Sequence, residues 1–226
     1  MVRLRAIAIA IVVTLYGCSL VSASCAKGPN VVRVREFVNQ TFIHGVPYSQ
    51  AQEFRSDADV DALVCLLNDS EEQPYWRNIV TVLGMSGNPR ASRPLIRFLE
   101  AGDGGLSKDI FAAKSAALLA LGYLAPKDRE VMSYLKASTD PGVWDTRGVQ
   151  WSAPYGLSTE ERDAQLSKYA ILALGVSGQP AAAEFLSNLK RGETLRLSSD
   201  FNDVIAEALR TNENVQRNGV AAYEKR

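Results

Sequence analysis

The sequence predicts an all-α fold, an α-solenoid of about five stacked helix pairs. Segments 79–84, 117–122 and 170–175 each end an apolar helical stretch with Leu-Gly. The apolar residues around them recur every three or four positions, as one buried helical face requires. No stretch sustains the apolar-polar alternation of a β-strand. A motif that recurs every 38 to 53 residues, as Leu-Gly does here, is typical of stacked helical repeats.

The residues after Leu-Gly predict how each pair turns. We expect the glycine of each Leu-Gly to end its helix, because glycine adopts the left-handed conformation at little cost. Ser86-Gly87-Asn88-Pro89 and Ser177-Gly178-Gln179-Pro180 follow two of the copies, and proline suits the first turn of a new helix. The second helices carry apolar residues at helical spacing: Leu95, Ile96, Phe98 and Leu99; Val131, Met132 and Leu135; and Phe185, Leu186 and Leu189.

The interval between repeats is not constant. Leu83, Leu121 and Leu174 are separated by 38 and then by 53 residues, so the second interval contains an insertion of roughly 15 residues. We place this insertion at about 140–158. Asp140-Pro141-Gly142 opens it, and Ser158 and Glu161 predict a capping box for the helix that follows.

Less regular units flank the three clear ones. Upstream, 34–43 and 59–67 are interpreted as one pair; downstream, 201–210 and 215–223 are interpreted as another. Degenerate end units are expected in a solenoid, because terminal repeats must present a face to solvent. Residues 24–226 are therefore predicted to form a single repeat domain.

The N-terminus predicts export. Arg3 and Arg5 precede an apolar run at 6–15 and then small residues, which is the layout of a signal peptide spanning 1–23. The alternative is a lipoprotein signal at 1–17, because Leu15-Tyr16-Gly17-Cys18 resembles a lipobox with Cys18 as the lipidated residue, although Tyr16 fits it poorly. The apolar run is too interrupted to span a bilayer. We expect a periplasmic or extracellular protein, attached to a membrane only through such a lipid.

Charge and cysteine content narrow the function classes. Removing Arg3 and Arg5 takes the basic count from 25 to 23 against 25 acidic residues, which argues against nucleic-acid binding. One histidine and no cysteine cluster argue against a zinc site, and nothing indicates a cofactor. Cys25 and Cys65 could pair in an oxidising compartment. The favoured alternative for Cys65 is a buried inert thiol, since it lies in the apolar run 62–67.

The clearest repeat segments, 74–84 and 168–178, resemble HEAT repeats, including the short bacterial HEAT-like form of PBS-lyase type. The resemblance covers about 150 residues and implies a curved solenoid whose concave face holds a protein or peptide. Some relatives are bilin lyases or their helpers, but those act in the cytoplasm, whereas this chain carries an export signal. Two features depart from the family: the 53-residue interval, and the lack of a charged residue repeated from unit to unit.

The insertion is the strongest candidate for partner binding. It contains Trp144, Arg147, Trp151 and Tyr155, and aromatic residues and arginine dominate binding hot spots. Long connections in compact domains also tend to be functional. The slightly favoured alternative is that both tryptophans fold back to fill a gap between repeats.

No catalytic residue emerges. His44 is the only histidine and lacks a recognisable nucleophile or orienting carboxylate, while adjacent acids such as Glu71-Glu72 point in different directions on a helix. We therefore expect a non-catalytic binding or scaffolding protein. The alternatives are an enzyme or enzyme-assembly factor that uses the insertion as an aromatic lid, and a purely structural envelope component.

Overall fold

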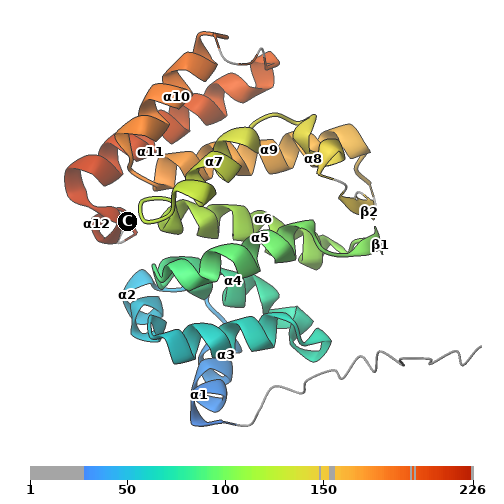
Figure 1. The fold of residues 1–226 in the computed structure, drawn as a ribbon, viewed down its shortest axis with the longest axis vertical. Coiled ribbons are helices and arrows are strands. Elements are labelled where there is room, and N and C mark those ends of the chain that lie inside the picture. Colours follow the sequence, from blue (N-terminus) through green and yellow to red (C-terminus); the bar gives the residue numbers. More distant parts are fainter. Residues whose placement is uncertain (1–27, 148, 153–155, 194, 196, 225–226) are drawn as a thin grey trace, which may run out of the picture.

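The computed structural model describes residues 28–147, 149–152, 156–193, 195 and 197–224. The described chain is mostly helical and has only two short strands, so the all-α prediction is confirmed (Figure 1). Residues 1–23, and with them Cys18, lie outside the described part. Within that part, no helix is long and apolar enough to cross a membrane.

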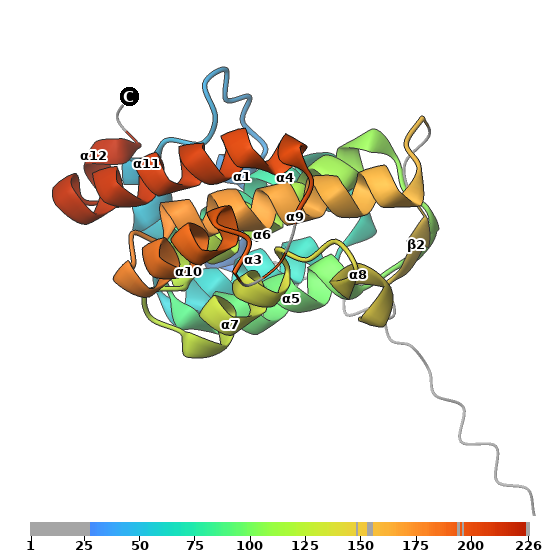
Figure 2. The same ribbon diagram turned by 90° about the horizontal axis from the view of Figure 1, so that it is seen from above.

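The long helices form two layers. Helices of the first layer pack against one another in chain order, from one end of the molecule to the other (Figure 1). Those of the second layer lie on one side of the first, as the view from above shows (Figure 2). The first layer contains α1 (Pro29–Val38), α4 (Trp76–Met85), α6 (Lys108–Leu124), α9 (Thr159–Val176) and α11 (Asn202–Asn218); the second contains α3 (Asp57–Leu67), α5 (Ser92–Glu100), α7 (Arg129–Ala137) and α10 (Pro180–Lys190).

Short elements connect the two layers. They are the α-helices α2 (Tyr48–Ala51), α8 (Val143–Thr146) and α12 (Val220–Tyr223), the 3₁₀ helices η1 (Gln52–Phe54), η2 (Ser70–Tyr75), η3 (Pro89–Ala91) and η4 (Ser199–Phe201), and the strands β1 (Asp103–Gly105) and β2 (Gln150–Ser152). The strands form one parallel pair, with Gly104 opposite Trp151. The sequence predicted no strands, because three glycine-rich residues cannot establish a period of two.

The Leu-Gly glycines set the spacing of the first layer. A Cβ on Gly84 would lie 2.5 Å from the Cα of Ala120, and one on Gly122 would lie 2.5 Å from the carbonyl oxygen of Ala173. A Cβ on Gly175 would lie 2.7 Å from the carbonyl oxygen of Ala208. Such distances are far below normal contact, so α4, α6, α9 and α11 can approach this closely only where glycine is present.

The predicted helix-ending role of these glycines is wrong. All three lie inside helices, and none has a positive φ. The left-handed positions are instead Gly87 and Gly178, three residues later, at φ of 63° and 60°. The Leu-Gly glycine is therefore required for helix-to-helix contact, and the turn glycine is required for backbone geometry.

The two turn motifs fold alike. The Ser86 hydroxyl donates to the Leu83 carbonyl oxygen at 2.7 Å and accepts from the Asn88 amide at 3.3 Å. The Ser177 hydroxyl donates to the Leu174 carbonyl oxygen at 2.6 Å and accepts from the Gln179 amide at 3.3 Å. These equivalent bonds support the alignment of the two sequence copies as one repeated unit.

The end units differ from expectation. Helix α1 ends at Val38 rather than near residue 43, and α11 continues through the gap predicted between 210 and 215. The continuation is stabilised by Asn212, which is buried and whose side-chain amide donates to the Leu174 carbonyl oxygen at 3.1 Å and to that of Gln179 at 3.3 Å. A polar residue that looked like a linker thus joins α11 to the preceding repeat.

Cys65 is disulfide-bonded, so the inert thiol favoured from the sequence is wrong. The other two cysteines of the chain, Cys18 and Cys25, lie outside the described residues. The misleading signal was the apolar run: Cys65 is only half-buried on α3, while Leu63 and Leu66 on the same helix are fully buried.

The close contacts predict an inverted response to a standard helix substitution. Alanine normally stabilises a helix interior by about 1 kcal/mol relative to glycine. Gly122→Ala and Gly175→Ala should instead lower the unfolding free energy by about 1–3 kcal/mol, because each added methyl group overlaps backbone of the next helix. Urea unfolding followed by circular dichroism measures this. Gly28→Ala, where the added carbon meets nothing within 4 Å, is the control; a stabilised Gly122→Ala would contradict the packing.

Candidate functional site

The insertion packs into the molecule. Trp144 and Trp151 are both 0% exposed. The indole nitrogen of Trp144 donates to the Ser167 hydroxyl at 3.2 Å, and that of Trp151 donates to the Leu99 carbonyl oxygen at 3.2 Å. As placed, neither indole can touch a partner, so both follow the packing alternative.

Arg147 is also engaged within the fold. Its guanidinium donates to the Ser138 hydroxyl at 2.7 Å and to the Tyr134 carbonyl oxygen at 3.3 Å. It also lies 3.9 Å from the centre of the Tyr134 ring. Arg147 therefore ties the insertion to α7. Tyr155, the fourth residue predicted for partner binding, lies outside the described residues.

A buried ion pair that the sequence analysis missed holds the far end of the insertion. The Arg162 side chain donates to the Trp151 carbonyl oxygen at 2.6 Å and to the Asp163 carboxylate at 2.7 Å. Burial raises the pKa of Asp163, against the opposing effect of Arg162. Arg162 thus fixes β2 to α9. No sequence signal identified it, because Arg162 reads as an ordinary polar residue in the first turn of a helix.

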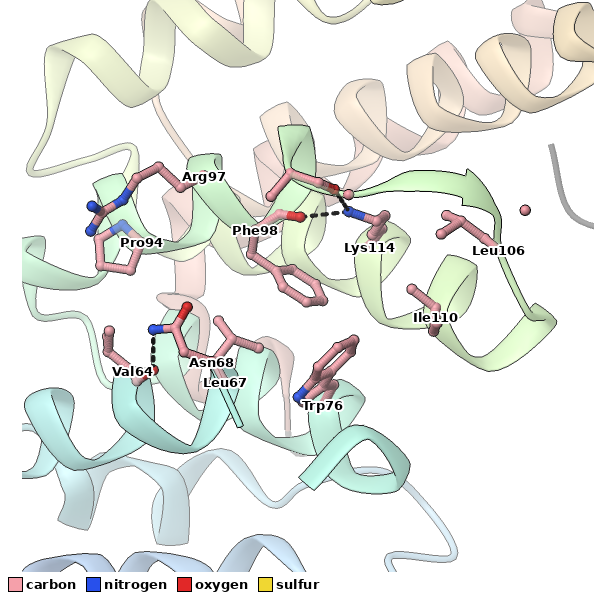
Figure 3. A pocket seen from close by; sticks show the side chains of 13 residues that line it. Val64, Leu67, Asn68, Trp76, Pro94, Arg97, Phe98, Leu106, Ile110 and Lys114 are labelled. Atoms are coloured by element: carbon pink, nitrogen blue, oxygen red, sulfur yellow. Dashed lines mark hydrogen bonds between the residues drawn. The ribbon is translucent and has the colours of Figure 1, made fainter. Parts of the chain in front are cut away.

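The main apolar pocket lies elsewhere, between α3 and α5 and beside the start of α6 (Figure 3). We call it the α3–α5 pocket; its volume is about 590 Å³, within the range of ligand sites. None of the described residues of the insertion lines it. Its lining residues are Val64, Leu67, Asn68, Trp76, Pro94, Arg97, Phe98, Ala101, Gly102, Gly105, Leu106, Ile110 and Lys114.

Two aromatic side chains meet in this pocket. Trp76 and Phe98 lie edge to face, with ring centroids 5.4 Å apart and planes at 84°. Both are half-buried, and Figure 3 shows the Phe98 ring between Leu67 and Ile110. The sequence analysis identified Phe98 as one of the apolar residues at helical spacing on its helix. It could not show that α3 and α5 stand apart here and leave the rings accessible.

Lys114 closes the back of the pocket. Its ammonium donates to the carbonyl oxygens of Phe98 at 2.6 Å, Leu99 at 3.2 Å and Ala101 at 2.8 Å, all at the C-terminal end of α5. The side chain is only 3% exposed, and burial lowers its pKa to about 8. Since all three N–H groups are used, Lys114 caps α5 and is not poised as a nucleophile.

Arg97 is the other charged residue of the lining. It is exposed, makes no ion pair within the described residues, and lies beside Pro94 at the rim (Figure 3). Asn68, across the pocket on α3, donates its side-chain amide to the Val64 carbonyl oxygen at 2.7 Å. Among the described residues, the lining is thus apolar with a cationic rim and without an acidic side chain.

The outer face of the first layer is a second candidate surface. Its half-buried side chains recur at helical spacing on α6 and α9 and are mostly small or apolar: Ala112, Ala116, Leu119, Tyr169 and Leu172. Near α1, a pocket of about 370 Å³ is lined by His44, Arg77, Tyr123 and Glu224 among others. The Tyr123 hydroxyl donates to the Glu224 carboxylate at 2.5 Å, which ties the segment after α12 to α6.

Neither surface carries recognisable catalytic or metal chemistry. His44 is exposed in the loop after α1, and the described residues contain no group of three or more potential metal ligands. Comparisons with protein-family models, curated proteins and solved structures found no match for the chain. Its function is therefore argued from its own geometry.

The packed insertion predicts a stability phenotype. Trp144→Ala and Trp151→Ala should each lower the unfolding free energy by about 3–5 kcal/mol, because a fully buried indole and its hydrogen bond are lost. Ile43→Ala, at a side chain that is 87% exposed, should change it by less than about 0.5 kcal/mol. Chemical unfolding of the three variants measures the contrast. If both tryptophan variants had native-like stability, the packing role would be contradicted and the tryptophans would again be candidates for partner binding.

Proposed function

We propose that the chain is an exported α-solenoid of HEAT type that binds a protein or peptide along its concave face without catalysis. The observation that carries this proposal is the repeated glycine–alanine contact, which joins the outer faces of α4, α6, α9 and α11 into one continuous surface. Continuous surfaces built from successive repeats are what solenoids use to hold extended partners.

The two layers differ in spacing, which supports a curved shape. First-layer neighbours are in backbone contact through the glycines, whereas α3 and α5 are separated by a pocket. A stack that is tighter on one side bends toward that side. The outer face of the first layer is therefore proposed as the concave face, with the α3–α5 pocket on the opposite layer.

The chemistry of the proposed concave face suits a polypeptide. Leu119, Tyr169 and Leu172 supply apolar contacts near its centre, and Arg77 and Glu207 bring opposite charges to its two ends. Partly exposed apolar side chains framed by polar ones are typical of protein interfaces. The near-neutral composition again gives no support to nucleic acid as the partner.

The alternative of an enzyme has one observation in its favour, the lowered pKa of Lys114, since perturbed titratable groups cluster at active sites. Its three hydrogen bonds to α5 account for this lysine as a helix cap. An aromatic lid is also unsupported, because Trp144 and Trp151 are packed into the core. Binding without catalysis remains the better proposal.

Export belongs to the same proposal. The disulfide at Cys65 supports an oxidising compartment, because disulfides persist mainly in secreted and periplasmic proteins. Residues 1–23 are proposed as the signal that directs it there, with a lipidated Cys18 as the alternative route. The partner is accordingly sought in the cell envelope or outside the cell.

Site-specific photocrosslinking in intact cells tests the proposal. A photoreactive phenylalanine at Thr81, Leu119 or Leu172 should give a discrete crosslinked species in the envelope fraction, because these positions lie on the first-layer face. The same residue at Ser133 or Glu184, exposed on α7 and α10, serves as the control. Equal crosslinking from both layers, or none from the first, would contradict binding along this face.

A further inference from the structure

We infer that the α3–α5 pocket is a second binding site, for a peptide segment that presents a large apolar side chain next to an acidic residue. It lies on the layer opposite the proposed concave face, and the two surfaces can be tested separately. The inference therefore does not depend on the concave face being occupied.

The pocket has room for an inserted side chain. Its volume of about 590 Å³ is larger than one amino-acid side chain, and its walls come from four helices, α3, α4, α5 and α6. The edge-to-face pair of Trp76 and Phe98 offers ring faces and edges at right angles. A third aromatic ring, or a leucine-sized group, can extend such an arrangement, which adds stabilisation beyond burial of area alone.

Two glycines contribute backbone to the mouth of the pocket. Gly102 and Gly105 contribute to the lining, and a Cβ built on Gly102 would meet nothing within 4 Å. Gly102 also has φ of 104°, a conformation that other residues rarely adopt. Because Gly102 has no side chain and open space beside it, the backbone of a bound peptide can pass close to this glycine in the loop that leads into β1.

The charges of the pocket favour an acidic neighbour. Lys114 has no hydrogen-bond donor left, so it cannot hold a ligand carboxylate. Arg97 stands at the rim with its guanidinium available, and the lining residues that the structure describes include no acidic one. A carboxylate is the group that pairs best with a guanidinium. Among the described lining residues it would meet no other negative charge. A peptide with an acidic residue next to its apolar one would place the apolar side chain against Trp76 and Phe98 and the carboxylate beside Arg97.

Three synthetic peptides test the inference directly on the full chain. They share one Gly-Ser frame and a fluorescent label and differ only at a central pair, which is Phe-Asp, Phe-Lys or Ala-Asp. Fluorescence anisotropy should give the tightest binding for Phe-Asp. Phe-Lys should bind about three- to fivefold more weakly than Phe-Asp, because it loses the exposed ion pair with Arg97. Ala-Asp should bind about tenfold more weakly, because it lacks the inserted aromatic side chain.

A charge-swap variant makes the test specific. Arg97→Glu should reverse the preference, so that Phe-Lys binds more tightly than Phe-Asp. Arg93→Glu is the control, since Arg93 is also exposed, lies four residues earlier on α5 and 3.8 Å from the Glu130 carboxylate, and does not line the pocket. It should leave the preference for Phe-Asp in place. Circular dichroism establishes that both variants remain folded.

Three results would overturn the inference. They are the absence of binding by any of the three peptides, equal binding of Phe-Asp and Phe-Lys to the native chain, and an equal effect of the two arginine variants. Crosslinking from Leu119 or Leu172 together with any of these results would leave the proposed function standing and remove only the second site. Peptide binding without crosslinks from Leu119 or Leu172 would support the second site and contradict the proposed binding along the concave face.

Discussion

The backbone contact between glycine and alanine in successive first-layer helices is the constraint on which the rest of the structure depends. Ala120 meets Gly84 of the preceding helix, and two residues later Gly122 meets Ala173 of the next. Gly175 and Ala208 repeat the arrangement. The two middle helices, α6 and α9, therefore carry both halves of the contact on their two sides, and the same interface is made three times. An added methyl group at any of these glycines would force its neighbour away and change the spacing of the layer.

The first layer fixes the spacing of the repeats, and the second layer adapts to that spacing. Its helices have 9 to 11 residues, against 17 or 18 in α6, α9 and α11, and the gap between α3 and α5 remains open as a pocket. Where the repeat is longer by the insertion, Trp144 and Trp151 fill the space, and their indole N–H groups donate to Ser167 of α9 and to Leu99 of α5. One interval is thus closed by its own extra residues, and another is left able to receive a foreign side chain.

The predictable part of the fold was the part encoded by local period. Apolar spacing and the recurring Leu-Gly predicted the helical class, the repeated turn and the place of the insertion. The glycines were identified but misinterpreted, because a helix-packing glycine and a helix-capping glycine look alike until the neighbouring helix is placed. The α3–α5 pocket was missed for a related reason. Trp151 and Phe98 are both aromatic residues beside a turn or at a helix end, and only the tertiary spacing decides that one is buried and the other lines a pocket.

The most direct test of the central contact is a nuclear Overhauser measurement on the full chain in solution. Hα–Hα cross-peaks between Gly84 and Ala120, Gly122 and Ala173, and Gly175 and Ala208 report the three approaches without changing the sequence. The account predicts cross-peaks for all three pairs, because a carbon added at each glycine would lie 2.5, 3.1 and 2.9 Å from the Cα atoms of Ala120, Ala173 and Ala208. Absence of these cross-peaks, with the assigned helices intact, would contradict the repeated packing on which both proposed surfaces rest.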